Sequence, residues 1–203
     1  MKLLSQILSA LLSPLLVPTY GVVLSLFLTV LSTVPAPVKW TVTGVCFAIT
    51  CLVPLLAIIV LHRIGLVKDP GLNNRNERLI PYVVSALSYG ACAAYLHTAH
   101  APSWLWLFMA GAGVATVVCA AVNFRWKISA HLTAMGGLTA IAFRILDMHI
   151  AAPGVNFILA AMAAVLLSGL LGTARIYLGR HTLWQTLAGM ANGFACVYLI
   201  SLI

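Results

Sequence analysis

Apolar residues occur along this chain in long stretches that short polar segments separate. Seven stretches are long enough to form membrane helices, because a hydrocarbon core about 30 Å thick requires about 20 mainly apolar residues per span. They cover residues 6–32, 40–61, 80–98, 103–122, 129–146, 154–173 and 183–202. The pattern predicts an all-α, polytopic transmembrane helical bundle of about seven spans, formed as a single domain over residues 1–203.

The first apolar stretch follows Lys2 and is longer than the apolar core of a secretion signal, which has about 7–15 residues. We therefore expect it to be retained as a span. Pro14, Pro18 and Gly21 predict a kinked helix there, because proline removes a backbone hydrogen bond and clashes with the preceding turn. A short re-entrant segment is the alternative.

The composition indicates the same class of protein. Of the 203 residues, 63% are hydrophobic and 7% are charged, which excludes an ordinary soluble domain. The five cysteines lie within predicted spans and lack the spacing of a zinc site or a disulfide framework, so we interpret them as small core residues. We expect an integral membrane protein, located in a bacterial inner (plasma) membrane.

Basic residues concentrate on one predicted side of the membrane, which we call the cationic face. If seven helices alternate in direction, the N-terminus and the loops after the second, fourth and sixth spans share this face. It then carries nine of the eleven basic residues: Lys2, Arg63, Lys68, Arg75, Arg78, Arg125, Lys127, Arg175 and Arg180. The positive-inside rule places the cationic face in the cytoplasm.

Three segments of the cationic face carry groups suited to phosphoryl transfer, which requires positive charge around the phosphate oxygens, a nucleophile and an acid for the leaving group. The first segment has Lys68, Arg75 and Arg78, whose side chains can converge on one anion. Contact between these cations and anionic lipid headgroups is the alternative.

The second segment opens the fifth predicted span with Ser129 and His131. A helix N-terminus offers free backbone N–H groups to a phosphate oxygen, and a histidine can donate a proton. The third segment places Arg175 and His181 between the sixth and seventh spans. Ionisable side chains at this depth are costly unless they have partners, which makes them candidates for function.

The order and spacing of these residues resemble the three motifs of the type 2 phosphatidic acid phosphatase family, membrane relatives of the vanadium haloperoxidases. The first family motif is Lys, six residues, Arg-Pro; the second is Pro-Ser-Gly-His; the third is Ser-Arg, five residues, His, three residues, Asp. The matching residues here are Lys68, Arg75, Ser129, His131, Arg175 and His181. The motifs are degenerate, with Asn76, Ile128, Ala130 and Ala174 in place of the other motif residues. The resemblance covers about residues 60–195 and implies a six-helix phosphatase-like core.

By this resemblance, His181 is the nucleophile that forms a phosphohistidine and His131 is the acid that protonates the leaving group. Lys68, Arg75, Ser129 and Arg175 bind the phosphate, and Arg78 shares or replaces the role of Arg75. No metal or other cofactor is expected. The implied partner is a phosphate or diphosphate monoester of a lipid (polyprenyl, phosphatidyl or glycolipid) rather than a nucleic acid, and many relatives act on the outer side of the membrane.

The chain departs from the third motif at Gln185, where the family has an aspartate that orients the nucleophilic histidine and stabilises its positive charge. An amide accepts a hydrogen bond without supplying that charge, and Glu77 is a candidate substitute from the first segment. Two alternatives to a phosphatase therefore stay open. One is a catalytically impaired homologue that binds, senses or transports a phosphorylated lipid, and the other is a structural subunit with a basic face.

Four further polar or aromatic positions have structural interpretations. Tyr82 is assigned to the aromatic belt at the membrane interface. Asn192 is expected to hydrogen-bond a neighbouring helix, and Arg144 and Asp147 are expected to form a local ion pair.

Overall fold

The computed structural model describes residues 1–69, 71, 72 and 74–203, and it confirms the all-α prediction. The α-helices are α1 (Lys2–Leu11), α2 (Val17–Leu28), α3 (Ala36–Phe47), α4 (Val53–Arg63), α5 (Leu79–Thr98), α6 (Ser103–Asn123), α7 (Ala130–Asp147), α8 (Phe157–Tyr177) and α9 (Leu183–Ile200). A π-helical turn, η2 (Ala48–Leu52), joins α3 to α4, and η1 (Val30–Thr33) and η3 (Arg75–Glu77) are 3-10 turns.

Five helices in the described part of the chain are long and apolar enough to cross a membrane: Ala36–Arg63, which is α3 and α4 with the π-turn between them, α5, α6, α8 and α9. Two of the seven predicted spans, 6–32 and 129–146, are not among them. The first is divided into two short helices. The second is α7, which carries Arg144 and Asp147 and is buried over most of its length.

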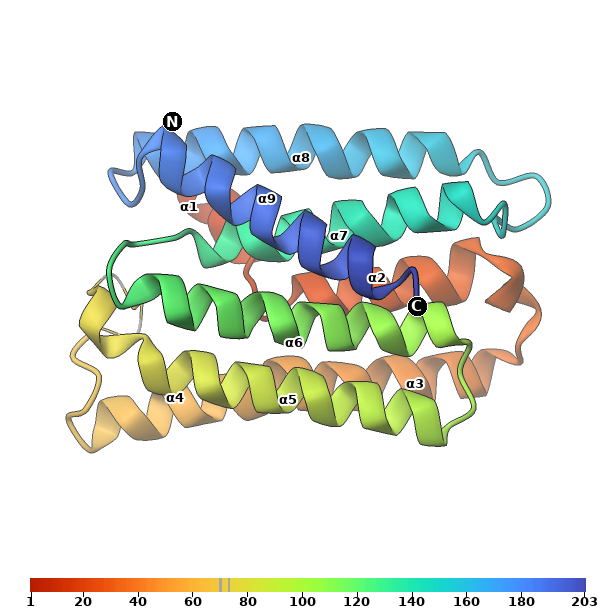
Figure 1. Ribbon diagram of the computed structural model, residues 1–203, viewed down its shortest axis with the longest axis horizontal. Helices are drawn as coiled ribbons and strands as arrows, with labels where there is room; N and C mark the ends of the chain where they lie inside the picture. Colours follow the sequence, from red (N-terminus) through yellow and green to blue (C-terminus); the bar gives the residue numbers. More distant parts are fainter. Residues whose placement is uncertain (70, 73) are drawn as a thin grey trace.

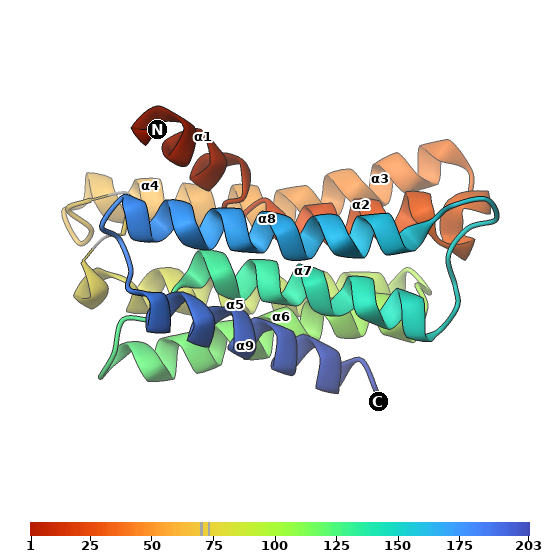
Figure 2. The same cartoon turned by 90° about the horizontal axis from the view of Figure 1, so that it is seen from above.

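The N-terminal stretch is two helices, so the prediction of one kinked helix is wrong. Pro14 lies in the connection, and Pro18 lies in the first turn of α2, where its missing N–H costs no hydrogen bond. Figure 2 shows α1 at an angle to the other helices, outside the main bundle. Its serines Ser5 and Ser9 are buried whereas Leu3, Leu4 and Leu11 are exposed, a pattern that suits a short helix with lipid on its outer side.

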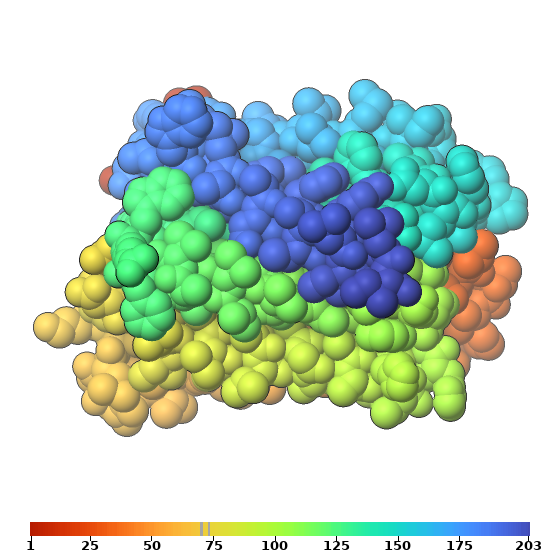
Figure 3. Space-filling view, in the orientation of Figure 1, coloured from red at the N-terminus to blue at the C-terminus, as the bar shows by residue number. Residues whose placement is uncertain are grey.

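The helix directions agree with the alternation expected from the sequence. In Figure 1 the N-terminus and the α4–α5, α6–α7 and α8–α9 connections lie at one end of the bundle, and the C-terminus lies at the other. The residues of all three candidate segments therefore lie at the same end. In the space-filling view, side chains of α5, α6 and α9 cover one face of the bundle (Figure 3).

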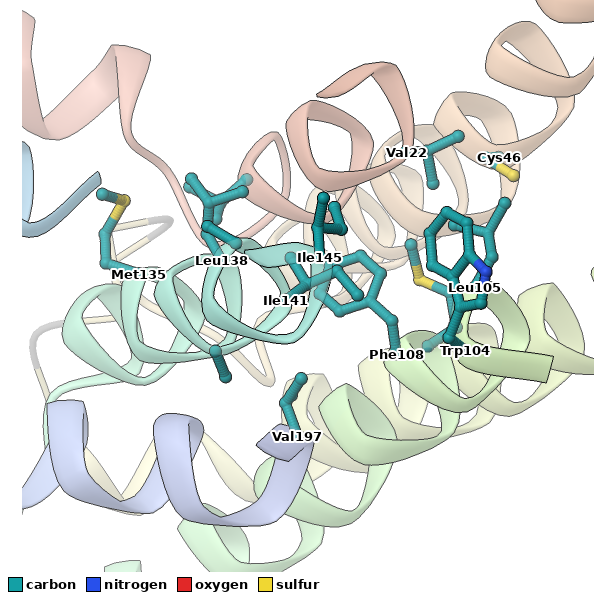
Figure 4. Packing of buried hydrophobic residues seen from close by; sticks show 14 of the residues in the cluster. Val22, Cys46, Trp104, Leu105, Phe108, Met135, Leu138, Ile141, Ile145 and Val197 are labelled. Carbon is teal, nitrogen blue, oxygen red and sulfur yellow. The ribbon is translucent and has the colours of Figure 1, made fainter. Parts of the chain in front are cut away.

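The hydrophobic core is centred on α7. Met135, Ile141 and Ile145 are almost fully buried and pack with Phe108 of α6 and Val197 of α9 (Figure 4). Helix α9 approaches α7 very closely, because a Cβ atom on Gly193 would overlap the Thr133 carbonyl oxygen. Nearer the start of α9, the Ser129 backbone N–H donates to the Gln185 carbonyl oxygen at 3.2 Å, which holds the α8–α9 connection beside the start of α7.

The smaller structural predictions are confirmed with one exception, Tyr82. The cysteines are free, four being buried and Cys196 half-buried. Asn192 donates through Nδ2 to the Ala115 carbonyl oxygen of α6 at 2.9 Å. Arg144 and Asp147 form an ion pair with 3.9 Å between Nη1 and Oδ2.

Candidate functional site

All three candidate segments contribute to one cavity of about 270 Å³. Arg78 comes from the loop before α5, His131 from the first turn of α7, Arg175 from the end of α8, and His181 from the α8–α9 connection. The convergence of the three segments at one cavity, expected from the sequence, is thus present in the fold.

Arg175 is the least compensated charge of this cavity. The residue is 8% exposed, and its Nε atom is buried without a hydrogen-bond partner in the described part of the chain. The neighbouring charges that act on it are those of Arg180 and Arg78, which have the same sign. A buried guanidinium without a counter-charge is costly, so the cavity has the electrostatics of an anion site.

Arg78 joins the first segment to the second. Its side chain is buried, with Nε donating to the Leu72 carbonyl oxygen at 2.7 Å and Nη1 donating to the Ile128 carbonyl oxygen at 3.3 Å. Both acceptors are neutral, so these bonds position the guanidinium without neutralising it. The remaining charge is available to an anion.

The two other basic residues predicted for the first segment do not line the cavity. Lys68 is exposed, and Arg75 is exposed with Nη1 donating to the Arg125 carbonyl oxygen at 2.7 Å. The reason is the short η3 turn, which directs Arg75 outward and places Arg78 inward. Pro70 and Asn73 of this segment lie outside the described residues.

Glu77 stabilises the loop and is not a partner of His181. Its carboxylate accepts hydrogen bonds from the Lys68 backbone N–H at 2.8 Å and from Asn74 Nδ2 at 3.1 Å. The hydrogen bond from Lys68 is the main cause that lowers the pKa of Glu77. The carboxylate therefore does not take the place of the missing aspartate.

Gln185 occupies the position beside His181 that the aspartate has in the family motif. Its Oε1 atom accepts the Thr182 backbone N–H at 3.2 Å, as part of a capping box at the start of α9, and lies 3.1 Å from His181 Nδ1. Because the amide oxygen only accepts, Nδ1 must carry the hydrogen, and Nε2 is left with the lone pair. The amide thus selects the tautomer that a nucleophile needs without adding negative charge.

His181 is neutral at physiological pH. The side chain is 7% exposed, and burial followed by the charges of Arg78 and Arg175 lowers its pKa to about 3. An anion bound between the arginines would reverse the second of these effects. The unprotonated Nε2 atom is available for attack on an electrophile such as phosphorus.

His131 also lines the cavity, together with Arg175 and His181. Its Nε2 atom lies 3.2 Å from the Ser9 carbonyl oxygen of α1. Because a carbonyl only accepts, Nε2 carries the hydrogen. Helix α1 therefore fixes the tautomer and the orientation of the His131 ring.

Ser129 is a helix cap and does not line the cavity. It is fully buried, and its Oγ atom accepts the Leu132 backbone N–H at 3.4 Å at the start of α7. Gly189 of α9 packs over it, since a Cβ there would lie 2.5 Å from the Ser129 carbonyl oxygen. The serine predicted to bind phosphate instead fixes the helix that presents His131.

Tyr82 is a cavity residue that the sequence interpretation missed. It is 8% exposed, and its hydroxyl is buried without a hydrogen-bond partner in the described residues. Its assignment to the aromatic belt is therefore wrong. The spacing could have shown this, because a residue four positions after Arg78 lies on the same face of a helix.

Among the described residues no three His, Cys, Asp or Glu side chains lie close enough together to hold a metal ion. Positive charge at the site comes from the arginines. A comparison of the chain with protein-family models, with curated proteins and with solved structures finds no match. The resemblance to the type 2 phosphatidic acid phosphatase family accordingly depends on the motif residues alone.

Proposed function

We propose that this protein is a membrane lipid phosphatase that hydrolyses a phosphate or diphosphate monoester of a lipid through a phosphohistidine. The observation that carries the proposal is Arg175, a buried guanidinium that has no counter-charge among the described residues, in a cavity that two imidazoles also line. An anionic ester would supply the missing charge, and the imidazoles would supply a nucleophile and an acid.

In the first step, Nε2 of His181 attacks phosphorus and the bond from phosphorus to the ester oxygen breaks. With the anionic ester bound, His131 acts in its imidazolium form: it gives one proton to the leaving alkoxide and becomes a neutral imidazole. Arg175 and Arg78 stabilise the charge on the phosphoryl oxygens. In the second step, water attacks the phosphohistidine, His131 accepts a proton from it, and phosphate leaves from His181.

The second candidate function is binding of a phosphorylated lipid without hydrolysis, and Gln185 favours it. When His181 attacks phosphorus, its ring becomes positively charged, and the amide of Gln185 cannot neutralise that charge. Loss of the corresponding carboxylate in serine proteases costs about 10⁴ in rate, partly through the wrong tautomer. Because the tautomer is correct here, we expect a slow enzyme rather than an inactive one.

Phosphate release from a panel of lipid phosphates, measured on the protein purified in detergent, tests the proposal. We expect release by the wild type, inhibition by vanadate, and loss of release in His181→Ala. His149→Asn, in the α7–α8 connection at the other end of the bundle, is the control, because asparagine tolerates the left-handed backbone there. Vanadate binding without phosphate release would favour the second candidate, and absence of both would leave a structural subunit.

We further propose seven traverses of a bacterial inner membrane, with α1 and α2 making the first and α7 the fifth. The charge bias places the cationic face in the cytoplasm, whereas the family resemblance implies the outer side. The C-terminus lies at the end opposite the cationic face (Figure 1), so a reporter fused after Ile203 distinguishes the two orientations. A reporter outside the cell membrane would place the site in the cytoplasm.

A further inference from the structure

The first turns of α5 form one wall of the cavity, outside the three candidate segments. Pro81, Tyr82 and Ser85 of this helix line the cavity together with Arg78. Figure 1 shows α5 beginning at the end of the bundle where the α6–α7 and α8–α9 connections lie. The Tyr82 backbone N–H donates to the Arg78 carbonyl oxygen at 2.9 Å, so the two side chains lie on one side of the helix. A tyrosine thus lies beside the cavity arginine.

The hydroxyl group of Tyr82 lacks an acceptor in the part of the chain that the structure describes. Its oxygen is buried and makes no hydrogen bond there. The ring packs against Cys119 and Ile128, and the Cys119 sulfur already accepts from Asn192 Nδ2 at 3.3 Å. Arg78 is a neighbour of the hydroxyl, but a guanidinium only donates. The hydroxyl hydrogen is therefore left unpaired, which is costly for a buried group.

Among the described residues, five others that carry a hydroxyl group line the cavity, and none of them shares this property. Three donate to backbone carbonyl oxygens at 2.8 to 3.1 Å: Tyr89, Thr116 and Thr133. The other two are half-buried, where water in the open part of the cavity can bond to them: Ser13 and Ser85. The unused donor of Tyr82 is therefore a particular feature of this position.

A neutral donor suits this cavity better than another cation. Phosphate oxygens only accept hydrogen bonds, and the serine that the family resemblance assigns to them, Ser129, caps α7 instead. Arg78 and Arg175 already repel each other, so a third cation would make the unliganded site more costly. A phenol hydroxyl donates a charge-assisted hydrogen bond to an anion without adding positive charge.

We propose that Tyr82 is a phosphate-binding residue, whose hydroxyl donates to a phosphoryl oxygen beside the Arg78 guanidinium. It supplies the neutral donor that Ser129 does not, from a helix face outside the three candidate segments. The inference rests on the anion site of the proposed function and not on hydrolysis, because an unreactive anion in this cavity uses the same donor.

Binding of inorganic vanadate to Tyr82→Phe, measured by calorimetry on the purified protein, tests the inference together with thermal unfolding. The substitution removes the hydroxyl group and keeps the buried ring. We expect vanadate affinity to fall roughly 10- to 150-fold, the range for a hydrogen bond to a charged group. The Tm of the unliganded protein should stay the same or rise, because an unpaired buried hydroxyl is removed.

Tyr198→Phe is the matched control. Tyr198 lies near the C-terminus, at the other end of the bundle, and its hydroxyl donates to Asp147 Oδ2 at 2.6 Å. Removal of this paired hydroxyl should lower the Tm or leave it unchanged, and vanadate affinity should stay as in the wild type. If Tyr82→Phe keeps the wild-type affinity, or lowers the Tm along with the affinity, Tyr82 is a structural residue and the inference is overturned.

Vanadate binding requires no ester to be cleaved, so a failure of this inference can be distinguished from a failure of the proposed enzyme. Vanadate affinity that depends on the Tyr82 hydroxyl, with no phosphate release from any lipid phosphate, would overturn the enzyme and support the residue as an anion ligand. Phosphate release with the same kcat and KM in the wild type and in Tyr82→Phe would support the enzyme and overturn the role of Tyr82.

Discussion

Replacing Arg175 by methionine should stabilise the unliganded protein and weaken its anion binding. The guanidinium is 8% exposed, its Nε atom has no partner in the described residues, and the charges of Arg180 and Arg78 repel it. Methionine keeps much of the apolar volume of the arginine stem and removes the charge. A substitution that raises the stability of the unliganded protein and lowers its affinity for an anion shows that the arginine serves ligand binding and not folding.

The expected size of each effect follows from general magnitudes. An unpaired buried ion costs several kcal/mol, and water in the open part of the cavity reduces this, so we expect a gain of about 1–3 kcal/mol. For a chain of this length, 1 kcal/mol corresponds to about 2–4 °C in Tm. Loss of charge-assisted hydrogen bonds worth about 1.5–3 kcal/mol should weaken vanadate binding roughly 10- to 150-fold.

Thermal unfolding in detergent, with and without vanadate, measures both effects on the same sample. The control is Arg180→Met, since Arg180 is exposed and its loss should change stability by no more than about 0.5 kcal/mol. If Arg175→Met lowers the Tm of the unliganded protein, or keeps the full vanadate-induced rise in Tm, Arg175 is a structural residue and the reasoning is refuted.

Three other predictions concern the nucleophile and the helix contact that positions it. Gln185→Asp should raise the rate of phosphate release by up to about 10⁴-fold by stabilising the charged ring of His181, and an unchanged rate in steady-state assays would contradict the assigned geometry. Because the pKa of His181 is lowered to about 3 in the folded state, against about 6.5 unfolded, the unfolded state binds the proton first as the pH falls. The unliganded protein should therefore lose stability from about pH 6.5 down to pH 3, by up to about 1.4 kcal/mol per pH unit. In His181→Gln the Tm should depend less on pH over this range. If the Tm of the wild type and that of His181→Gln fall equally with pH, the prediction is contradicted. Gly193→Ala should cost about 3 kcal/mol or more by forcing α9 away from the Thr133 carbonyl oxygen, whereas Gly169→Ala should be neutral or stabilising in the same unfolding assay.

Helix alternation made the location of the candidate segments predictable. Long apolar stretches require helices, and helices that alternate in direction bring the connections after the second, fourth and sixth spans to one end. Alternation places Arg175, His131 and His181 at one end of the bundle, and the packing of α7 against α9 then brings them to one cavity. The role of Asn192 was predictable for a similar reason, because a buried amide in an apolar helix must find a partner on its neighbour.

Other features depended on local geometry that apolar patterning does not encode. The division of the first apolar stretch into α1 and α2 depends on the positions of Pro14 and Pro18 relative to the first residue of α2, Val17. The 3-10 turn η3 is the reason that Arg78, and not Arg75, lines the cavity. Ser129 caps α7 because its hydroxyl accepts the free backbone N–H of Leu132 and does not face the cavity. The contact between His131 and Ser9 joins residues 122 positions apart, which no local pattern predicts.

A structure of the protein with vanadate tests the central claim most directly. The account predicts vanadium bonded to Nε2 of His181, with the guanidinium groups of Arg175 and Arg78 on its oxygens and His131 on the opposite side. Vanadate bound at the exposed residues Lys68 and Arg75 instead, with the Arg175 cavity unchanged, would contradict it.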